Sequence, residues 1–276
     1  MSEALEKLFG IKDKRIVITG GGGILCGEMA RSLAGLGARV AVLDLSEAAA
    51  KTVADDIRKN GGRAIAVKAN VLDKPSLEAA RDEVVRRFGG IDALVNGAGG
   101  NKKEATTSDT LPFFDLPADA IRFVFELNVI GTVLPSQVFG KLLTQAGSGA
   151  IVNTSSMNAF RPLTKVVGYS AAKAAVSNFT QWLAVHMAQN YSKDIRVNAI
   201  APGFFLTEQN RFLLTDEKTG QLTPRGKTVI DHTPMGRFGA PVDLIGTVVW
   251  LLSDGARFVH GIVVPVDGGF SAFSGV

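Results

Sequence analysis

A tyrosine and a lysine four residues apart, Tyr169 and Lys173, are the side chains best suited to moving a proton. This spacing places both side chains on one face of a helix. Ser156 lies thirteen residues before Tyr169, at the end of an apolar run that is typical of a strand. A lysine charge favours the phenolate and lowers the pKa of a tyrosine. With a serine hydroxyl to bond a carbonyl oxygen, the set suits interconversion of an alcohol and a ketone, provided that a hydride carrier lies beside it.

A glycine-rich segment, residues 19–27, follows the first strand-like run and precedes a helical pattern. Gly21, Gly23 and Cys26 give the spacing G-x-G-x-x-small, in which glycines let the backbone approach a pyrophosphate that the next helix N-terminus binds. Glycines alone could form only a flexible turn. The strand–loop–helix order and a later acid favour a dinucleotide site. The contacts expected from this segment are Gly20, Gly21, Gly23, Ile24 and Leu25.

Asp44 is the later acid, and it ends the second strand-like run, 24 residues after Gly20. An acid near this distance binds a ribose 2′-hydroxyl. Its other interpretation is a turn or capping residue, a role that Ser46 could fill instead. Residue 45 is leucine, so no arginine next to the acid would hold a 2′-phosphate, and a carboxylate repels one. We therefore expect NAD(H) rather than NADP(H).

The small residues that close the fourth strand-like run, Asn96, Gly97 and Ala98, would also let the backbone approach a cofactor. An ordinary turn at the end of a strand is the alternative.

Strand-like and helical patterns alternate along the chain, which predicts an α/β fold: a doubly wound parallel sheet (Rossmann-like) of about seven strands with helices on both faces. The expected strands are residues 15–19, 39–44, 63–69, 91–96, 150–155, 195–201 and 262–266. The expected helices are residues 25–36, 46–60, 74–88, 117–145, 168–191 and 241–252. No linker or repeat divides residues 1–276, so we expect a single dinucleotide-binding domain.

Two segments interrupt the alternation, residues 99–114 and residues 203–239. Both follow an expected strand, and in an open α/β sheet the loops at the carboxyl ends of strands bind ligands. Segments of such length are commonly lids or binding loops. We expect residues 203–239 to be a lid over the substrate.

The composition restricts the function classes. A formal charge of +4 without a block of five basic residues indicates no nucleic-acid partner and mildly favours an anionic small substrate. The single cysteine, Cys26, fits a reducing compartment, and residues 1–14 lack the apolar segment of a signal peptide, so we expect a cytoplasmic protein. No run has the roughly 18 apolar residues of a membrane span, and no cluster has metal-ligand spacing. We expect no membrane and no metal.

Together these motifs resemble the short-chain dehydrogenase/reductase family over about residues 10–269. The segments that carry the resemblance are 19–27, 44, 70–71, 96–99, 128, 156, 169, 173, 202–203 and 267–269. The resemblance implies that Tyr169 is the acid/base, that Ser156 orients the substrate oxygen, and that Lys173 binds the nicotinamide ribose and tunes Tyr169. It also implies that Asn128 holds a water in a proton relay to Lys173.

The remaining cofactor contacts implied by the resemblance are Asn70, Val71, Pro202 and Gly203, besides Tyr169 and Lys173 themselves. Two motifs depart from the family pattern. Ile24 and Cys26 stand where the usual glycine loop of the family has glycines. A subset of the family has a different glycine loop, and this chain matches that loop except at Cys26. Asn70 replaces the usual aspartate, and its amide can still reach an adenine edge.

A narrower resemblance, in residues 155–165, 202–211 and 232–238, is to family members assigned as D-mannonate oxidoreductases (fructuronate reductases). It implies D-fructuronate and D-mannonate as the substrate pair, and the family implies a homotetramer built through the helices that carry Asn128 and Tyr169. The alternatives are a gluconate 5-dehydrogenase, a 3-oxoacyl reductase or, in another class, a sensor that binds NAD(H) without turnover.

A sugar acid needs a cationic partner for its carboxylate and polar groups for its hydroxyls. The expected substrate-binding residues are Ser156, Asn158, Arg161 and Arg211, and Lys102 is a further candidate for the carboxylate. Each basic residue alone is more often a solvated loop side chain. Ser155 is an alternative to Ser156 as the functional hydroxyl.

Overall fold

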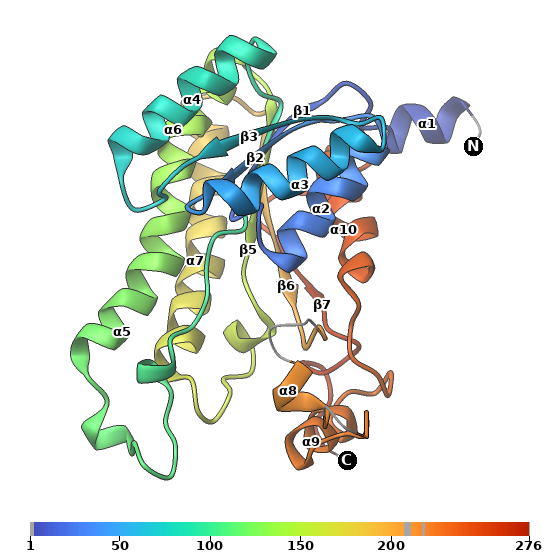
Figure 1. The fold of residues 1–276 in the computed structure, drawn as a ribbon. Coiled ribbons are helices and arrows are strands. Elements are labelled where there is room, and N and C mark those ends of the chain that lie inside the picture. The colour runs from blue at the N-terminus through green and yellow to red at the C-terminus, as the bar shows by residue number, and fades with distance from the viewer. Residues whose placement is uncertain (1–2, 207–210, 217–218, 276) are drawn as a thin grey trace.

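The structure, a computed structural model, describes residues 3–206, 211–216 and 219–275 (Figure 1). Seven parallel strands form one sheet in the order β3-β2-β1-β4-β5-β6-β7. The strands are β1 (Arg15–Thr19), β2 (Arg39–Asp44), β3 (Arg63–Lys68), β4 (Ala93–Asn96), β5 (Gly149–Thr154), β6 (Ile195–Pro202) and β7 (Val263–Val266). No predicted strand end departs from the observed one by more than two residues. The predicted doubly wound sheet is confirmed, and the strand order reverses between β1 and β4.

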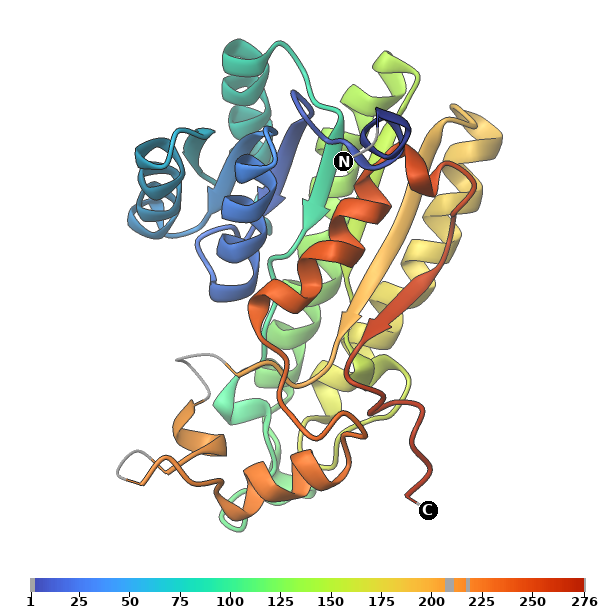
Figure 2. The same ribbon diagram turned by 90° about the vertical axis from the view of Figure 1, so that its right-hand side faces the viewer.

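Helices cover both faces of the sheet, as Figures 1 and 2 show. Successive strand residues point to opposite faces, so Ile16 and Ile18 pack in one core cluster and Val17 in the other. This is why the central strands are apolar throughout. The helices on one face are α2 (Ile24–Gly35), α3 (Glu47–Lys59) and α10 (Ile245–Leu252), and those on the other are α4 (Lys74–Phe88), α6 (Gly131–Ala146) and α7 (Val167–Asn190).

Helix ends follow the capping residues in the sequence. Ser46 precedes α3 and its Oγ accepts a hydrogen bond from Ala49 N at 3.3 Å, as predicted. Asp73 caps α4 in the same way, and α4 ends at Gly89, which has a positive φ of 77°. A further helix, α1 (Glu3–Phe9), was not expected from the sequence.

The long helix predicted over residues 117–145 is interrupted. It consists of α5 (Ala118–Phe125), a π-helical turn over Glu126–Ile130, and α6. By length and composition alone, Ala118–Ala146 could cross a membrane, but half of its apolar window is buried inside the protein. Because α6 packs against α4, β4 and β5, this stretch is part of the core.

The predicted lid contains two helices that the sequence analysis did not anticipate, α8 (Arg211–Leu214) and α9 (Pro224–Asp231). Both lie beyond the carboxyl ends of the strands (Figures 1 and 2). Residues 207–210 and 217–218 of the lid are outside the described residues. The other long loop, residues 99–114, meets the segment before α7 through a hydrogen bond from Thr107 N to Lys165 O of 2.9 Å.

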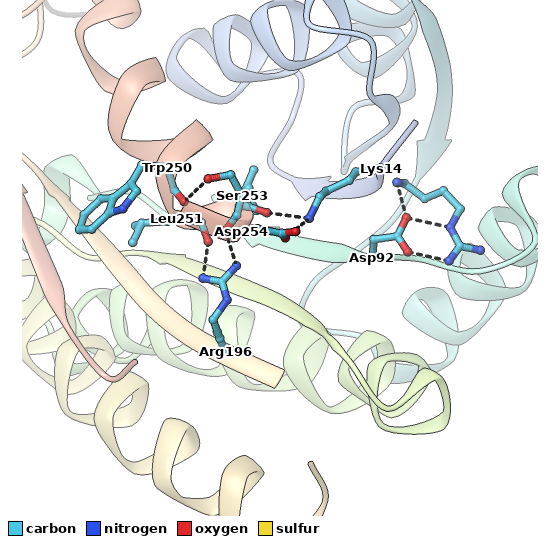
Figure 3. Close-up of polar contacts among 9 residues, drawn as sticks. Lys14, Asp92, Arg196, Trp250, Leu251, Ser253 and Asp254 are labelled. Carbon is cyan, nitrogen blue, oxygen red and sulfur yellow. Dashed lines mark hydrogen bonds and ion pairs between the residues drawn. The ribbon is translucent and has the colours of Figure 1, made fainter. Parts of the chain in front are cut away.

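At the opposite, amino-terminal edge of the sheet, basic side chains bind the end of α10 (Figure 3). The Arg196 guanidinium donates to Leu251 O at 2.7 Å and to Ser253 O at 3.1 Å. Lys14 Nζ donates to Leu252 O at 3.2 Å. The last carbonyls of a helix have no intrahelical donor, and cations are favourable there. These contacts join α10 to β6 and to the residue before β1.

Replacing Arg196 by methionine should lower the free energy of unfolding by about 2 kcal/mol, because two carbonyls lose their donors. For a chain of this length, the midpoint of thermal unfolding should fall by about 5 °C, which calorimetry measures. Arg257→Met is the matched control, since Arg257 lines the same cavity as Arg196 but is exposed. An equal loss in both variants would contradict the role assigned to Arg196.

Candidate active site

Tyr169 and Lys173 lie in the first two turns of α7, at the carboxyl edge of the sheet. Lys173 Nζ lies 5.5 Å from the centre of the Tyr169 ring and donates to Thr154 O, at the end of β5, at 2.8 Å. The lysine is only 3% exposed. The Tyr169 ring is partly buried against Ala120 and Val124 of α5. The structure therefore brings the pair together as the spacing predicts. The end of β5 fixes the lysine, and α5 packs against the tyrosine.

Ser156 follows β5 in extended conformation, and its hydroxyl lies close enough to the Tyr169 side chain to lower the pKa of that phenol. The neighbouring serine has a different role. Ser155 is 1% exposed, donates to Lys173 O at 3.1 Å and lies 2.7 Å from Ser177 Oγ. Because the Ser155 hydroxyl is already bonded to residues of α7, Ser156 is the serine whose hydroxyl is available to a substrate.

The protonation of the pair follows from its burial. The expectation that Lys173 lowers the pKa of Tyr169 is wrong for the protein without its ligands: burial raises the pKa of the phenol, and the nearby Ser156 hydroxyl lowers it by less. Burial lowers the pKa of Lys173 to about 8. At neutral pH the site thus holds a neutral phenol beside a charged ammonium, which is the protonation state needed to donate a proton to a ketone oxygen.

The burial of Lys173 predicts a pH dependence of stability. Its pKa is about 8 in the folded protein against 10.5 for an ordinary lysine, so the unfolded chain binds more protons between these values. Stability should rise as the pH increases from 8 to 10, by about 2 kcal/mol relative to Lys173→Met. Urea unfolding of both proteins at the two pH values measures this difference. A constant difference would contradict the burial of a charged lysine.

Asn128 lies in the π-helical turn and is fully buried. Its Nδ2 donates to Gly100 O at 2.7 Å and to Val124 O at 2.8 Å, and its Oδ1 accepts from Gly100 N at 3.1 Å. A π turn widens the helix by one residue and is common at functional sites. The side chain therefore holds the loop after β4, and the main-chain carbonyl accepts a hydrogen bond from Thr132 Oγ1 at 2.8 Å.

Sequence reasoning missed two glycines of this loop as site residues. A Cβ on Gly99 would lie 2.7 Å from Asn128 Oδ1 and 3.1 Å from Lys173 Nζ. Only a glycine lets these side chains face each other, and Gly100 supplies the backbone groups that Asn128 binds. The signal in the sequence was the doubled glycine directly after the turn at residues 96–98.

The glycine-rich loop is held between the ends of neighbouring strands. Gly20 has a positive φ of 64°, and a Cβ there would lie 2.8 Å from Ala98 Cα. Gly21 N donates to Leu43 O at 2.9 Å, and Thr19 Oγ1 accepts from Gly97 N at 3.1 Å and Ala98 N at 3.3 Å. The ends of β1, β2 and β4 thus form one backbone cradle.

The cradle fits a dinucleotide. Helix α2 begins after Gly23 with no capping side chain, so its first-turn amides, those of Ile24 and Leu25 among them, are available to a pyrophosphate. Asp44 stands beside the loop, where its Oδ2 accepts from Gly22 N at 3.0 Å and its Oδ1 from Ser46 N at 2.9 Å. Each carboxylate oxygen keeps a lone pair for a ribose hydroxyl. Asp44 therefore shapes the turn and remains able to bind the ribose.

Cys26 stands where the usual family loop has a glycine, and Gly97 makes room for it. A Cβ on Gly97 would lie 2.1 Å from Cys26 Sγ. Burial raises the pKa of this thiol to about 12, so it is not a nucleophile. The larger side chain at position 26, in α2, is thus accommodated by the missing side chain at position 97, directly after β4.

Two predicted cofactor residues use their side chains within the protein. Asn96 donates to Ser136 Oγ and to Asn153 Oδ1, both at 2.9 Å, so any contact it makes to a cofactor comes from its backbone. The Asn70 Oδ1 accepts from Leu72 N at 3.0 Å and shapes the turn after β3. Val71 follows it and is 8% exposed.

Pro202 and Gly203 end β6 beside β7. Gly203 N donates to Val266 O at 3.0 Å, and a Cβ on Gly203 would lie 2.6 Å from Asp267 Cα. This close packing sets where the segment after β6 leaves the sheet.

The predicted substrate residues are not all in one place. Asn158 is buried and donates from its backbone N to Ser156 Oγ at 3.3 Å. Arg161 lines a cavity of about 440 Å³ between its own segment and helix α9. Arg211 is the exposed first residue of α8 and is absent from the lining of that cavity. The structure thus places Asn158 beside Ser156, Arg161 at the cavity, and Arg211 apart from the cavity.

Within the described ranges, no group of three or more His, Cys, Asp or Glu residues could hold a metal ion.

Comparisons with known proteins agree with this geometry. A family model described as enoyl-(acyl carrier protein) reductase matches residues 25–271. An uncharacterized oxidoreductase of Bacillus subtilis, UxuB, is 50% identical over 272 residues, covering 95% of this chain and 96% of that protein.

Two solved structures share the whole fold. A Haemophilus influenzae protein, provisionally named a D-mannonate oxidoreductase and holding NAD, is 47% identical with a TM-score of 0.90, and the match covers 97% of this chain and 98% of the other. A gluconate 5-dehydrogenase of Burkholderia cenocepacia, in complex with NADP and tartrate, is 30% identical with a TM-score of 0.86, covering 98% and 100%. By sequence and by fold, this chain belongs to the short-chain dehydrogenase/reductase family of NAD(P)-dependent oxidoreductases.

Proposed function

We propose that this enzyme uses NAD(H) to interconvert a sugar-acid ketone and its secondary alcohol, with D-fructuronate and D-mannonate as the favoured pair. The observation that carries the chemistry is the convergence of Ser156, Tyr169 and Lys173 at the carboxyl edge of the sheet. The substrate assignment is supported by the provisional name of the Haemophilus protein, which is 47% identical to this chain.

In the reductive direction, the Ser156 and Tyr169 hydroxyls donate hydrogen bonds to the ketone oxygen. A nicotinamide held in the backbone cradle would supply the hydride. Tyr169 then gives its proton to the oxygen, and the charge of Lys173 stabilises the phenolate that remains. Lys173, with a water held at Asn128, returns a proton to Tyr169. Oxidation reverses these steps, with Tyr169 as the base.

The preference for NAD(H) is proposed from Asp44. Its carboxylate is fixed by the Gly22 and Ser46 amides at the position expected for ribose recognition, and residue 45 is the exposed Leu45 rather than an arginine. A 2′-phosphate would meet a negative charge there with no cation beside it. NAD bound to the Haemophilus relative supports this, whereas NADP in the Burkholderia enzyme shows that relatives differ.

We propose that one dinucleotide-binding domain spans the chain and that residues 203–239 act as its substrate lid. Two observations support the lid: α8 and α9 lie beyond the carboxyl ends of the strands, and Phe204 lines a cavity together with residues of α9. The amides and carbonyls of Phe204, Leu206 and Gly239 bond across the base of the segment, which closes the lid at its base.

We also propose a cytoplasmic homotetramer. The α6–α7 face has a groove of about 610 Å³, and Trp182 and Tyr191 beside it are 56% and 59% exposed. Exposed aromatic residues around a groove favour contact with a second copy. The buried free thiol of Cys26 suits a reducing compartment. Sedimentation equilibrium should give four times the chain mass, and a monomer would contradict the proposal.

A panel of ketones tests the substrate class. D-fructuronate should be reduced with NADH at the highest kcat/KM. Higher activity on 5-keto-D-gluconate would favour the second candidate, a gluconate 5-dehydrogenase, which the Burkholderia relative supports. Preference for 3-oxoacyl substrates, or NADH binding without oxidation across the panel, would contradict the proposed function.

A further inference from the structure

The cavity beside Arg161 has a distinctive charge pattern. It lies between residues 161–166 and helix α9, encloses about 440 Å³, and has no acidic residue in its lining. The side chains relevant to binding are Arg161, Thr164, Lys165, Phe204, Arg225, Thr228, His232 and Phe270. Three cations around one cavity repel one another, so a bound anion would stabilise the arrangement.

The basic groups of this cavity differ from the other arginines of the protein. Most arginines, such as Arg15 with Asp92 and Arg237 with Asp243, are paired with an acid. Among the residues that the structure describes, neither Arg161, Lys165 nor Arg225 has an acidic partner. Their charges remain available to a ligand.

The cavity adjoins the catalytic residues along the chain on two sides. Residues 161–166 connect Ser156 to Tyr169, and Val166, which lines the cavity, directly precedes α7. Phe204 follows the end of β6, and its ring packs edge-to-face against Phe270 at 5.2 Å. Two of the segments that line the cavity are therefore continuous in the chain with β6 and with the stretch that joins Ser156 to Tyr169.

Local hydrogen bonds orient the binding groups. Arg161 Nε donates to Ser271 O at 3.2 Å, which leaves its two Nη atoms for a carboxylate. His232 Nδ1 lies 2.9 Å from Thr228 O, so it carries the proton, and Nε2 can accept from a hydroxyl. Together with the hydroxyls of Thr164 and Thr228, the cavity offers cations for an acid and small polar groups for a polyol.

We propose that this cavity binds the carboxylate of the substrate, with Arg225 of α9 and Arg161 of the facing segment as its partners. The proposal rests on the proposed sugar-acid function and replaces Arg211 with Arg225 as the lid residue that recognises the acid. Because Arg225 belongs to the lid and Arg161 to the segment before Tyr169, the carboxylate joins the two and holds the lid over the reacting carbonyl.

The test compares an acid with its neutral analogue in Arg225→Gln. D-fructuronate and its methyl ester carry the same ketone, and only the first has a carboxylate. Arg225→Gln should lower kcat/KM for the acid by about 10- to 100-fold, while kcat/KM for the ester changes less than about twofold. Arg161→Gln should act in the same direction, and Arg225→Lys should restore part of the loss. The matched control is Lys227→Gln, on the same helix but paired with Asp231 at 3.5 Å, which should change neither substrate.

The outcomes separate the two proposals. If the wild type prefers the acid and Arg225→Gln keeps that preference, the cavity does not bind the carboxylate and the proposed function stands. Equal losses on acid and ester would assign Arg225 a structural role and overturn the inference. If the wild type turns over neither compound, the sugar-acid function fails and the inference fails with it.

Discussion

Replacing Tyr169 by phenylalanine should reduce turnover at least about 10³-fold in both directions while NADH still binds. The ring would keep its packing against Ala120 and Val124, so the change removes only the hydroxyl that gives and takes the proton. Ser156 would still donate a hydrogen bond to the ketone oxygen. It could not replace Tyr169 as the proton donor, because no adjacent charge stabilises a serine alkoxide. Steady-state kinetics and NADH fluorescence titration measure the two effects separately.

The chain provides its own control for this experiment, because Tyr191 is its other tyrosine. Tyr191 caps the far end of α7 and is 59% exposed, so Tyr191→Phe should keep wild-type kcat. Substantial activity in Tyr169→Phe would refute the proposed mechanism. A matching loss of NADH affinity would instead mean that the hydroxyl is needed to form the cofactor site.

Replacing Asp44 by asparagine should shift the cofactor preference from NADH toward NADPH by at least about tenfold. The amide keeps an oxygen that can accept from Gly22 N or Ser46 N, so the turn is largely preserved. It loses the charge that binds ribose hydroxyls strongly and repels a 2′-phosphate. The ratio of kcat/KM for the two cofactors, measured at one ketone concentration, reports the shift.

Asp55→Asn is the control for Asp44, since Asp55 is an acid of the following helix that pairs with Arg58 on the surface. It should leave the cofactor ratio unchanged. The assignment of Asp44 fails if the wild-type enzyme already prefers NADPH or uses both cofactors equally well.

The strands and most helices could be predicted because their signals are local. Apolar runs bounded by turns predicted all seven strands, and Ser46 marked where α3 begins. Spacing within one helix also placed Tyr169 beside Lys173. These features depend on neighbours a few residues apart, so the sequence displays them directly.

The rest of the site depends on contacts between distant segments. Nothing near Asn128 in the chain shows that its amide binds Gly100, 28 residues away. The same holds for Cys26, whose size is tolerated because residue 97 has no side chain. Helices α8 and α9 were missed because proline and glycine indicate loops, although Thr223 and Pro224 form an N-terminal signal, in which Thr223 caps α9 at Gly226 N.

The π-helical turn over Glu126–Ile130 makes the site sensitive to chain length as well as to side-chain identity. A π turn holds one more residue than an α turn, so the extra residue is absorbed within the turn and the helices on either side keep their relative orientation. Deleting one residue from this turn would restore a regular α-helix and remove the wide turn in which the Asn128 side chain meets Gly100. The length of this turn is therefore as much a part of the site as the amide of Asn128.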